Sequence, residues 1–93
     1  VRVAQSLNYP MVNQYMSIGQ NLYLVEIKIS EKCQGTSIEK LLIGVKDSID
    51  PLLVRRKNDI FKLIELSFVL EAGDSLVLAG SLNALKKIAP RLL

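Results

Sequence analysis

Apolar and polar residues alternate most clearly between Leu22 and Ser30. Because side chains along a strand point to opposite faces in turn, this alternation predicts a half-buried strand with one face toward the core. The residues expected on the core face are Tyr23, Val25, Ile27 and Ile29, and the opposite face carries Leu24, Glu26 and Lys28.

Three later apolar runs predict further strands, at Pro51–Arg56, Ile60–Leu66 and Leu76–Ala79. Only Lys57–Asp59 separates the first two runs, and Asn and Asp tolerate the dihedral angles of a tight turn. We therefore expect the first two of these strands to pair as a hairpin. Glycine and aspartate then precede the last strand, which indicates a second turn.

That second turn and the helix after it follow from local signals. Gly73 can adopt a positive φ without steric cost, and the Asp74 side chain can bond the backbone ahead of it. Ser81 is expected to cap a helix over Leu82–Ala89, which Pro90 ends because proline has no amide N–H to donate. These residues predict structure and carry no evident acid, base or nucleophile.

Two more helices are predicted upstream. Thr36 and Glu39 have the spacing of a capping box, and the helix that they begin should end at Gly44 with Ile38, Leu41 and Leu42 facing inward. Pro10–Ile18 is expected to form an apolar helix that Gly19 ends as a left-handed cap. This first helix packs either on its own domain or on a partner subunit or an upstream part.

The elements together predict an α+β fold. It consists of a small, mainly antiparallel sheet or half-barrel of about four strands, with a helix after the first strand and a second helix at the C-terminus. Residues 1–21 are expected to form a linker segment with a helix, and residues 22–93 a single domain. Because the first residue is Val1, we expect the chain to be a piece of a longer protein.

Composition argues against several classes of function. The net charge is +3, from 12 basic and 9 acidic residues, and the two basic clusters lack neighbouring aromatic residues, so nucleic-acid binding is not favoured. Histidine is absent, which disfavours zinc and removes the commonest general base. Cys33 stands alone and is expected to be a half-buried loop thiol in a reducing compartment. Asp47 and Asp50 are close in the sequence, and we interpret them as solvated loop residues. We therefore expect that the chain is not an enzyme and binds no metal or cofactor.

The segment around the second turn resembles a known family. The TrkA C-terminal domain, the C-terminal lobe of the RCK regulators of potassium conductance, carries Leu-x-x-Gly-Asp-x-Leu followed by three hydrophobic residues, a glycine and a helix. Here the matching residues are Leu70, Gly73, Asp74, Leu76, Val77, Leu78, Ala79 and Gly80. Gly35–Leu41 is similar to a second family segment, and the likeness extends back to about Leu22.

This resemblance implies a cytosolic domain that senses a ligand, forms homodimers and regulates a potassium channel or transporter. Its implied partners are an upstream nucleotide-binding lobe and a membrane pore, which would hold the domain at the inner membrane, and a small nucleotide or cation as ligand. Surplus apolar surface on the first helix and the strands also favours a homodimer. The alternative is a structural dimerisation module of another ion or anion transporter, without a ligand.

The resemblance also implies where a ligand would bind. Several members of the family bind cyclic di-AMP between two C-terminal lobes, with an arginine just after the first helix and an asparagine entering the second strand. Counted from Leu41, these positions fall on Gly44 and Asp50 here. The missing guanidinium and the added carboxylate predict weak or no binding of cyclic di-AMP. The groove predicted for another ligand, or for dimer contact, consists of Ile43, Gly44, Lys46, Ile49, Asp50 and Arg55.

Arg55 enters this prediction because it ends a strand together with Arg56. Neighbours on a strand point to opposite faces, so at most one of the two can approach a given site. Either one arginine contacts an anionic ligand or the carboxylate of a partner, or both are solvated at the end of the strand.

Overall fold

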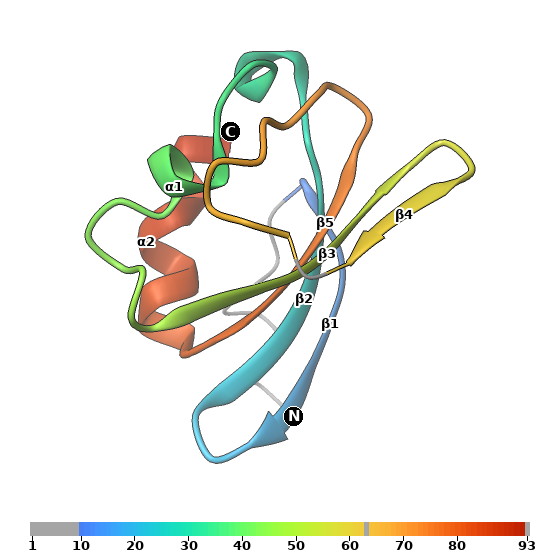
Figure 1. The fold of residues 1–93 in the computed structure, drawn as a ribbon. Helices are drawn as coiled ribbons and strands as arrows, with labels where there is room; N and C mark the ends of the chain where they lie inside the picture. The colour runs from blue at the N-terminus through green and yellow to red at the C-terminus, as the bar shows by residue number, and fades with distance from the viewer. Residues whose placement is uncertain (1–9, 63, 93) are drawn as a thin grey trace.

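The structure is a computed structural model that describes residues 10–62 and 64–92. Five strands form one antiparallel sheet in the order β1-β2-β5-β3-β4 (Figure 1). The strands are β1 (Val12–Gly19), β2 (Leu22–Lys28), β3 (Ile49–Arg56), β4 (Asp59–Lys62) and β5 (Ser75–Gly80). Helix α1 (Ile38–Leu41) connects β2 to β3, and α2 (Leu82–Leu92) follows β5. The predicted α+β class is confirmed.

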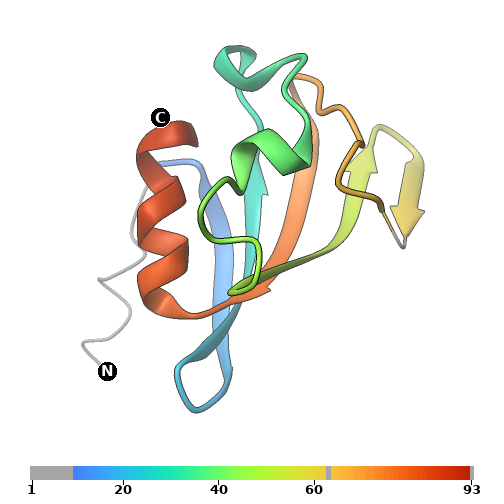
Figure 2. The same cartoon turned by 60° about the vertical axis from the view of Figure 1, so that its left-hand side comes forward.

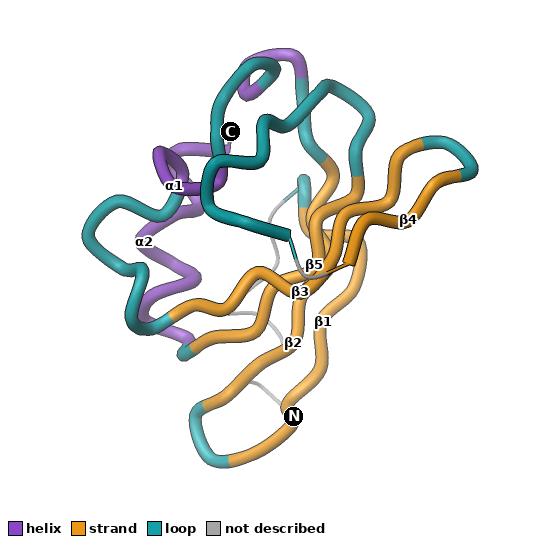
Figure 3. The backbone as a smooth tube through the Cα atoms, viewed as in Figure 1, coloured by secondary structure: helices purple, strands orange, loops and turns teal. Residues whose placement is uncertain are grey.

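Both helices lie on the same side of the sheet (Figures 1 and 2). The strand side chains that face them are fully buried, among them Val25, Ile27, Ile49, Val54, Leu76 and Leu78. From the helices, Ile38, Leu41, Leu42, Leu85 and Ile88 complete this core. The other side of the sheet carries no helix in the described part of the chain (Figure 3). We call that side the open face.

The predicted helix over Pro10–Ile18 is wrong, because Val12–Gly19 is the edge strand β1. Val12 lies opposite Ile27 and Tyr15 opposite Val25, so backbone pairing to β2 decides the structure of this segment. The two strands are adjacent in the sequence and are separated only by Gln20 and Asn21. Residues 12–19 therefore belong to the same sheet as the strands after Leu22, and residues 1–9 of the predicted linker lie outside the described residues.

The turn between β1 and β2 also differs from the prediction. Gly19 is not in a left-handed conformation, and the turn residue with a positive φ is Asn21, at 54°. Asparagine reaches this region more easily than most residues because its short polar side chain can bond locally.

Helix α1 is a single turn, and its cap is Ser37 where the capping box predicted Thr36. The Ser37 side-chain oxygen accepts the backbone N–H of Lys40 at 3.2 Å. The backbone of Thr36 is engaged elsewhere, since its carbonyl accepts the N–H of Leu70 at 2.9 Å. The backbone N–H of Glu39 likewise donates to the carbonyl of Leu66 at 2.8 Å. Contacts with the 64–74 loop therefore shift the start of the helix by one residue.

The predicted hairpin is confirmed as β3 and β4, although both strand limits change. β3 begins at Ile49, two residues before the prediction, and its register shifts between Pro51 and Leu53. A bulge at this point accommodates a proline, which cannot donate to the ladder. Lys57 has a φ of 54° in the turn, and β4 ends at Lys62.

Helix α2 continues through Pro90 to Leu92, so the prediction that Pro90 ends the helix is wrong. Contacts with the rest of the domain hold the last turn in place of the lost hydrogen bond. The Arg91 guanidinium donates to the carbonyl of Leu41 at 2.8 Å, and Leu92 is buried in the core. The Cys33 thiol donates to the carbonyl of Arg91 at 3.3 Å.

Candidate functional site

The loop between α1 and β3 holds most of the predicted groove. Gly44 has a φ of +86°, a conformation that L side chains rarely adopt, so glycine is favoured there by the backbone itself. Ile43 next to it is 57% exposed, which is high for a side chain of its size. The loop returns to the sheet at Ser48, whose carbonyl lies 2.7 Å from the position that a Cβ on Gly80 would occupy. The absence of a side chain at Gly80 therefore lets this loop pack against the end of β5.

Charges around this loop are exposed and only weakly paired. The Lys46 ammonium lies 3.9 Å from a carboxylate oxygen of Glu39, and both side chains are about half exposed. Asp50 is exposed and lies opposite Ala79 on the open face. An anion that approached this loop would meet one flexible, partly neutralised cation and a nearby carboxylate.

The structure brings together only part of the predicted groove. Ile43, Gly44, Lys46 and Asp50 lie along the loop and the start of β3, whereas the Ile49 side chain is 1% exposed and belongs to the core. Arg55 lies five residues after Asp50 along β3, a separation of roughly 17 Å. It contacts Glu26 there, and the two groups are 2.8 Å apart. The groove itself stays a prediction, with Arg55 lying at the far end of the strand.

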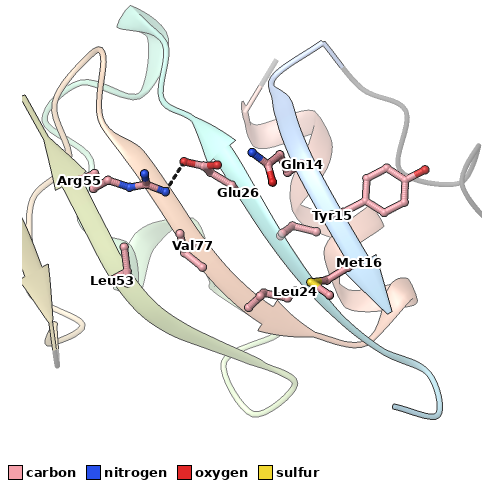
Figure 4. Close-up of a pocket in the computed structure, with 9 residues that line it drawn as sticks. Gln14, Tyr15, Met16, Leu24, Glu26, Leu53, Arg55 and Val77 are labelled. Carbon is pink, nitrogen blue, oxygen red and sulfur yellow. Dashed lines mark hydrogen bonds and ion pairs between the residues drawn. The ribbon is translucent and has the colours of Figure 1, made fainter. Parts of the chain in front are cut away.

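Arg55 belongs instead to a groove of about 350 Å³ on the open face (Figure 4). Its floor is apolar and its rim is polar, and strands from across the sheet contribute to it. The side chains that point into it are Gln14, Met16, Leu24, Glu26, Leu53, Arg55 and Val77, and we call it the open-face groove. Tyr15 points away from it (Figure 4), as expected for a residue opposite Val25.

Sequence reasoning missed this groove because it expected a helix where β1 lies. The signal was present: Gln14 and Met16 alternate with Tyr15, and a strand would place the first two on the face opposite the third. The same alternation in β2 had already placed Leu24 and Glu26 away from the core. Reading both segments as strands would have joined the two outer faces.

Arg56 points to the opposite side from Arg55 and makes the most buried ion pair among the described residues. Its Nε and Nη2 donate to the two carboxylate oxygens of Asp74 at 2.9 and 2.8 Å. Asp74 is 1% exposed and also accepts the backbone N–H of Glu71 at 2.9 Å. The guanidinium lies over the rings of Phe61 and Phe68, 5.4 and 5.2 Å from their centroids.

This environment lowers the pKa of Asp74. Burial alone would raise that pKa, but the hydrogen bonds from Arg56 and from the backbone of Glu71 outweigh it, together with the positive charge of Arg56. The Asp74 carboxylate is therefore kept ionised, and it accepts three hydrogen bonds. It bonds the backbone behind it, at Glu71, where the sequence predicted the backbone ahead.

Cys33 is buried in the core, more deeply than the half-buried loop thiol that was predicted. Burial raises the pKa of its thiol, and Lys32 opposes this only in part. Such a thiol is a poor nucleophile at neutral pH. Among the described residues, no cluster of acidic or thiol side chains could hold a metal ion. No helix within residues 10–62 and 64–92 has the length and apolar character needed to cross a membrane.

The fold of this chain is similar to that of a solved regulator domain. Among solved structures, the chain is similar to the C domain of the potassium transport protein KtrA, a regulator of conductance of K⁺ (RCK), in complex with cyclic diadenosine monophosphate. The two share 29% sequence identity with a TM-score of 0.62, over 73% of this chain and 80% of that one. The sequence matches no protein-family model and no curated protein. The predicted likeness to the RCK C-terminal domain is thus supported at the level of fold.

Proposed function

We propose that this chain is a regulatory domain of a potassium transport protein, and that it acts by binding and not by catalysis. The observation that carries the proposal is the similarity to the KtrA C domain, which combines a matching fold with 29% identity over most of both chains. A binding role is also supported by the two buried ionisable groups, because Asp74 and Cys33 both form hydrogen bonds within the domain. In the proposal, the domain lies on the cytoplasmic side of the membrane and is held there by its parent protein.

The proposed role is tested by potassium uptake in the source cells. Removing the coding segment for residues 22–92 should change the rate of potassium uptake or its response to external potassium. The matched control is Asp47→Asn, an exposed loop substitution that leaves the domain in place. Unchanged potassium uptake after removal, with changed transport of another ion or anion, would instead favour the alternative of a dimerisation module in a different transporter.

A ligand can be sought on the purified chain. Any compound that binds the native state and not the unfolded state raises the melting temperature, so nucleotides and monovalent and divalent cations should be tested in turn. A shift that saturates with concentration supports a sensing domain. No shift with any of them supports the structural alternative, a module without a ligand.

Cyclic di-AMP, the compound in the KtrA structure, is expected to bind weakly or not at all. Gly44 offers no cation, Asp50 presents an exposed carboxylate, and Lys46 is partly neutralised by Glu39. Calorimetry should therefore give a dissociation constant well above about 1 μM, which corresponds to roughly −8 kcal/mol. Tighter binding would show that these substitutions were misjudged.

A pair of substitutions sharpens this test. Asp50→Asn removes the repulsive charge and restores the amide that the family resemblance places there, so it should strengthen binding of cyclic di-AMP. Asp47→Asn removes another exposed charge from the same loop, at a residue outside the predicted contact. Equal effects of both changes would indicate a general charge effect and no site at Asp50.

A further inference from the structure

The open-face groove has a charged end and an apolar end (Figure 4). Among the described residues that line it, only Glu26 and Arg55 are charged, and they form an ion pair at 2.8 Å. The apolar side chains of the lining lie to one side of this pair: Met16, Leu24, Leu53 and Val77. The groove therefore offers one cation and one anion, with no net charge, beside an apolar floor.

The register of the strands explains this arrangement. Glu26 on β2 is level with Val77 on β5. Arg55 on β3 is level with Ser75, two residues from Val77 along β5. Arg55 therefore reaches Glu26 diagonally across β5, and the pair lies at one end of the groove. Leu24 lies two residues from Glu26 in the other direction, so roughly 7 Å of strand with apolar side chains follows the pair.

The two charged side chains differ in their contact with water. The Glu26 side chain is 16% exposed and the Arg55 side chain 51%. Because the Glu26 carboxylate has lost much of its water, a cation beside it is attracted more strongly than at an open surface. The Arg55 guanidinium donates from Nη2 to Glu26, and the outer edge of such a fork can bind a second carboxylate.

Ligands of a single charge do not suit this groove. An anion that binds Arg55 is repelled by Glu26, and a cation that binds Glu26 is repelled by Arg55. A purely apolar molecule would take water from both groups without replacing its hydrogen bonds, which costs free energy. A ligand avoids all of these penalties when it carries a cation and an anion close together, with an apolar group beside them.

We propose that the open-face groove binds a small zwitterion of this kind, an α-amino acid with an aliphatic side chain such as leucine or methionine. Its ammonium faces Glu26, its carboxylate faces Arg55, and its side chain covers Val77 and Leu24. The charges of the ligand and the protein then alternate in sign. A groove of about 350 Å³ is at the lower end of the range for ligand sites, which suits so small a molecule.

This site is separate from the groove predicted on the α1–β3 loop, because Arg55 lies roughly 17 Å along β3 from Asp50. The inference does not rest on the proposed role in potassium transport. Binding of an amino acid is measured on the chain alone, whereas the potassium role is measured by uptake in cells, so either can fail without the other.

Calorimetry on the 93-residue chain with L-leucine and three analogues tests the proposal. The analogue 4-methylpentanoate lacks the ammonium, 3-methylbutylamine lacks the carboxylate, and glycine lacks the aliphatic side chain. Leucine should bind with a dissociation constant below about 1 mM, and each analogue at least about tenfold more weakly. A leucine dissociation constant above about 1 mM overturns the proposal. Equal binding of leucine and 4-methylpentanoate also overturns it, because the groove then accepts a simple anion.

Glu26→Gln separates the proposed contact from a general effect on the domain. The change removes the partner of the ammonium and the repulsion of a lone carboxylate. Leucine should therefore bind at least about tenfold more weakly, whereas 4-methylpentanoate should bind at least as tightly as it does to the wild type. A variant that melts as the wild type does and binds leucine unchanged contradicts the proposal.

Two cations on the open face provide a matched pair of further variants. Arg55→Gln removes the partner of the carboxylate and should weaken leucine binding at least about tenfold. Lys62 lies opposite Leu53 on β4 and does not line the groove, so Lys62→Gln should change leucine binding less than about twofold. Melting curves confirm that each variant folds. Equal effects of the two changes would overturn the proposal, because they would indicate a general effect of charge.

Discussion

Replacing Asp74 by alanine is expected to destabilise the domain more than removing any other acidic side chain among the described residues. The carboxylate accepts two hydrogen bonds from Arg56 and one from the backbone of Glu71, all within 2.9 Å, and it is fully buried. Removing one member of a buried ion pair costs about 3–5 kcal/mol, because the remaining charge loses its partner. Charged hydrogen bonds contribute about 1.5–3 kcal/mol each, and the change removes them all.

The lower end of that range applies here. The Arg56 side chain is still 25% exposed, so the guanidinium can regain water and keep its contacts with Phe61 and Phe68. We therefore expect Asp74→Ala to lower the free energy of unfolding by about 3 kcal/mol. For a domain of this size, that corresponds to a decrease in melting temperature of roughly 12–24 °C.

Urea denaturation followed by circular dichroism measures the change, with the wild type and the variant at the same protein concentration. The matched control is Glu71→Gln, which removes a second carboxylate from the same arginine. That carboxylate is 3.4 Å from Arg56 and 59% exposed, and exposed pairs contribute about 0–1 kcal/mol. If Asp74→Ala costs no more than Glu71→Gln, burial does not set the strength of this pair and the reasoning fails.

Three further predictions concern the same turn and the end of β5. Gly73→Val should lower the free energy of unfolding by roughly 1–3 kcal/mol, because Gly73 has a φ of +93°, which valine rarely adopts. A Cβ at this position would contact nothing, so the strain lies in the backbone alone, and an unchanged urea midpoint would refute this. Gly80→Ala should also lower the free energy of unfolding by roughly 1–3 kcal/mol, because its Cβ would lie 2.7 Å from the carbonyl oxygen of Ser48. A variant with wild-type stability and an unmoved loop in its crystal structure would contradict this prediction. Acid should weaken the domain as the pH falls below about 4: the pKa of Asp74 is lowered on folding, so the unfolded state binds the extra proton and the free energy of unfolding decreases. Asp74→Asn should lose this part of the pH dependence, and equal slopes for both proteins would count against it.

Local signals identified the elements whose structure is decided within a few residues. The turn at Gly73, the hairpin at Lys57 and the alternation in β2 are all of this kind, and each is present. Contacts between separate elements decided the rest. β1 is a strand because β2 offers it an edge, and α2 continues past Pro90 because Leu41 and Cys33 hold its last turn.

The candidate site shows the same division. The family resemblance, counted from Leu41, placed Gly44, Lys46 and Asp50 together, and in the structure these residues lie along one loop and the start of β3. The predicted strand Pro51–Arg56 already implied that Arg55 lies roughly 17 Å from Asp50, because a strand rises about 3.3 Å per residue. The sequence could not foresee that the Ile49 side chain is directed into the core, because the bulge near Pro51 changes which residues of β3 share a face.

Arg55 and Arg56 show how one position along a strand separates two kinds of contact. Arg56 lies on the helix side, where Asp74 and two aromatic rings enclose it, so it fixes the 64–74 loop to the sheet. Arg55 lies on the open face, where its side chain is 51% exposed and its contact with Glu26 is screened by water. The Arg55 pair therefore contributes little to the stability of the domain, whereas the Arg56 pair contributes much more because Asp74 is buried.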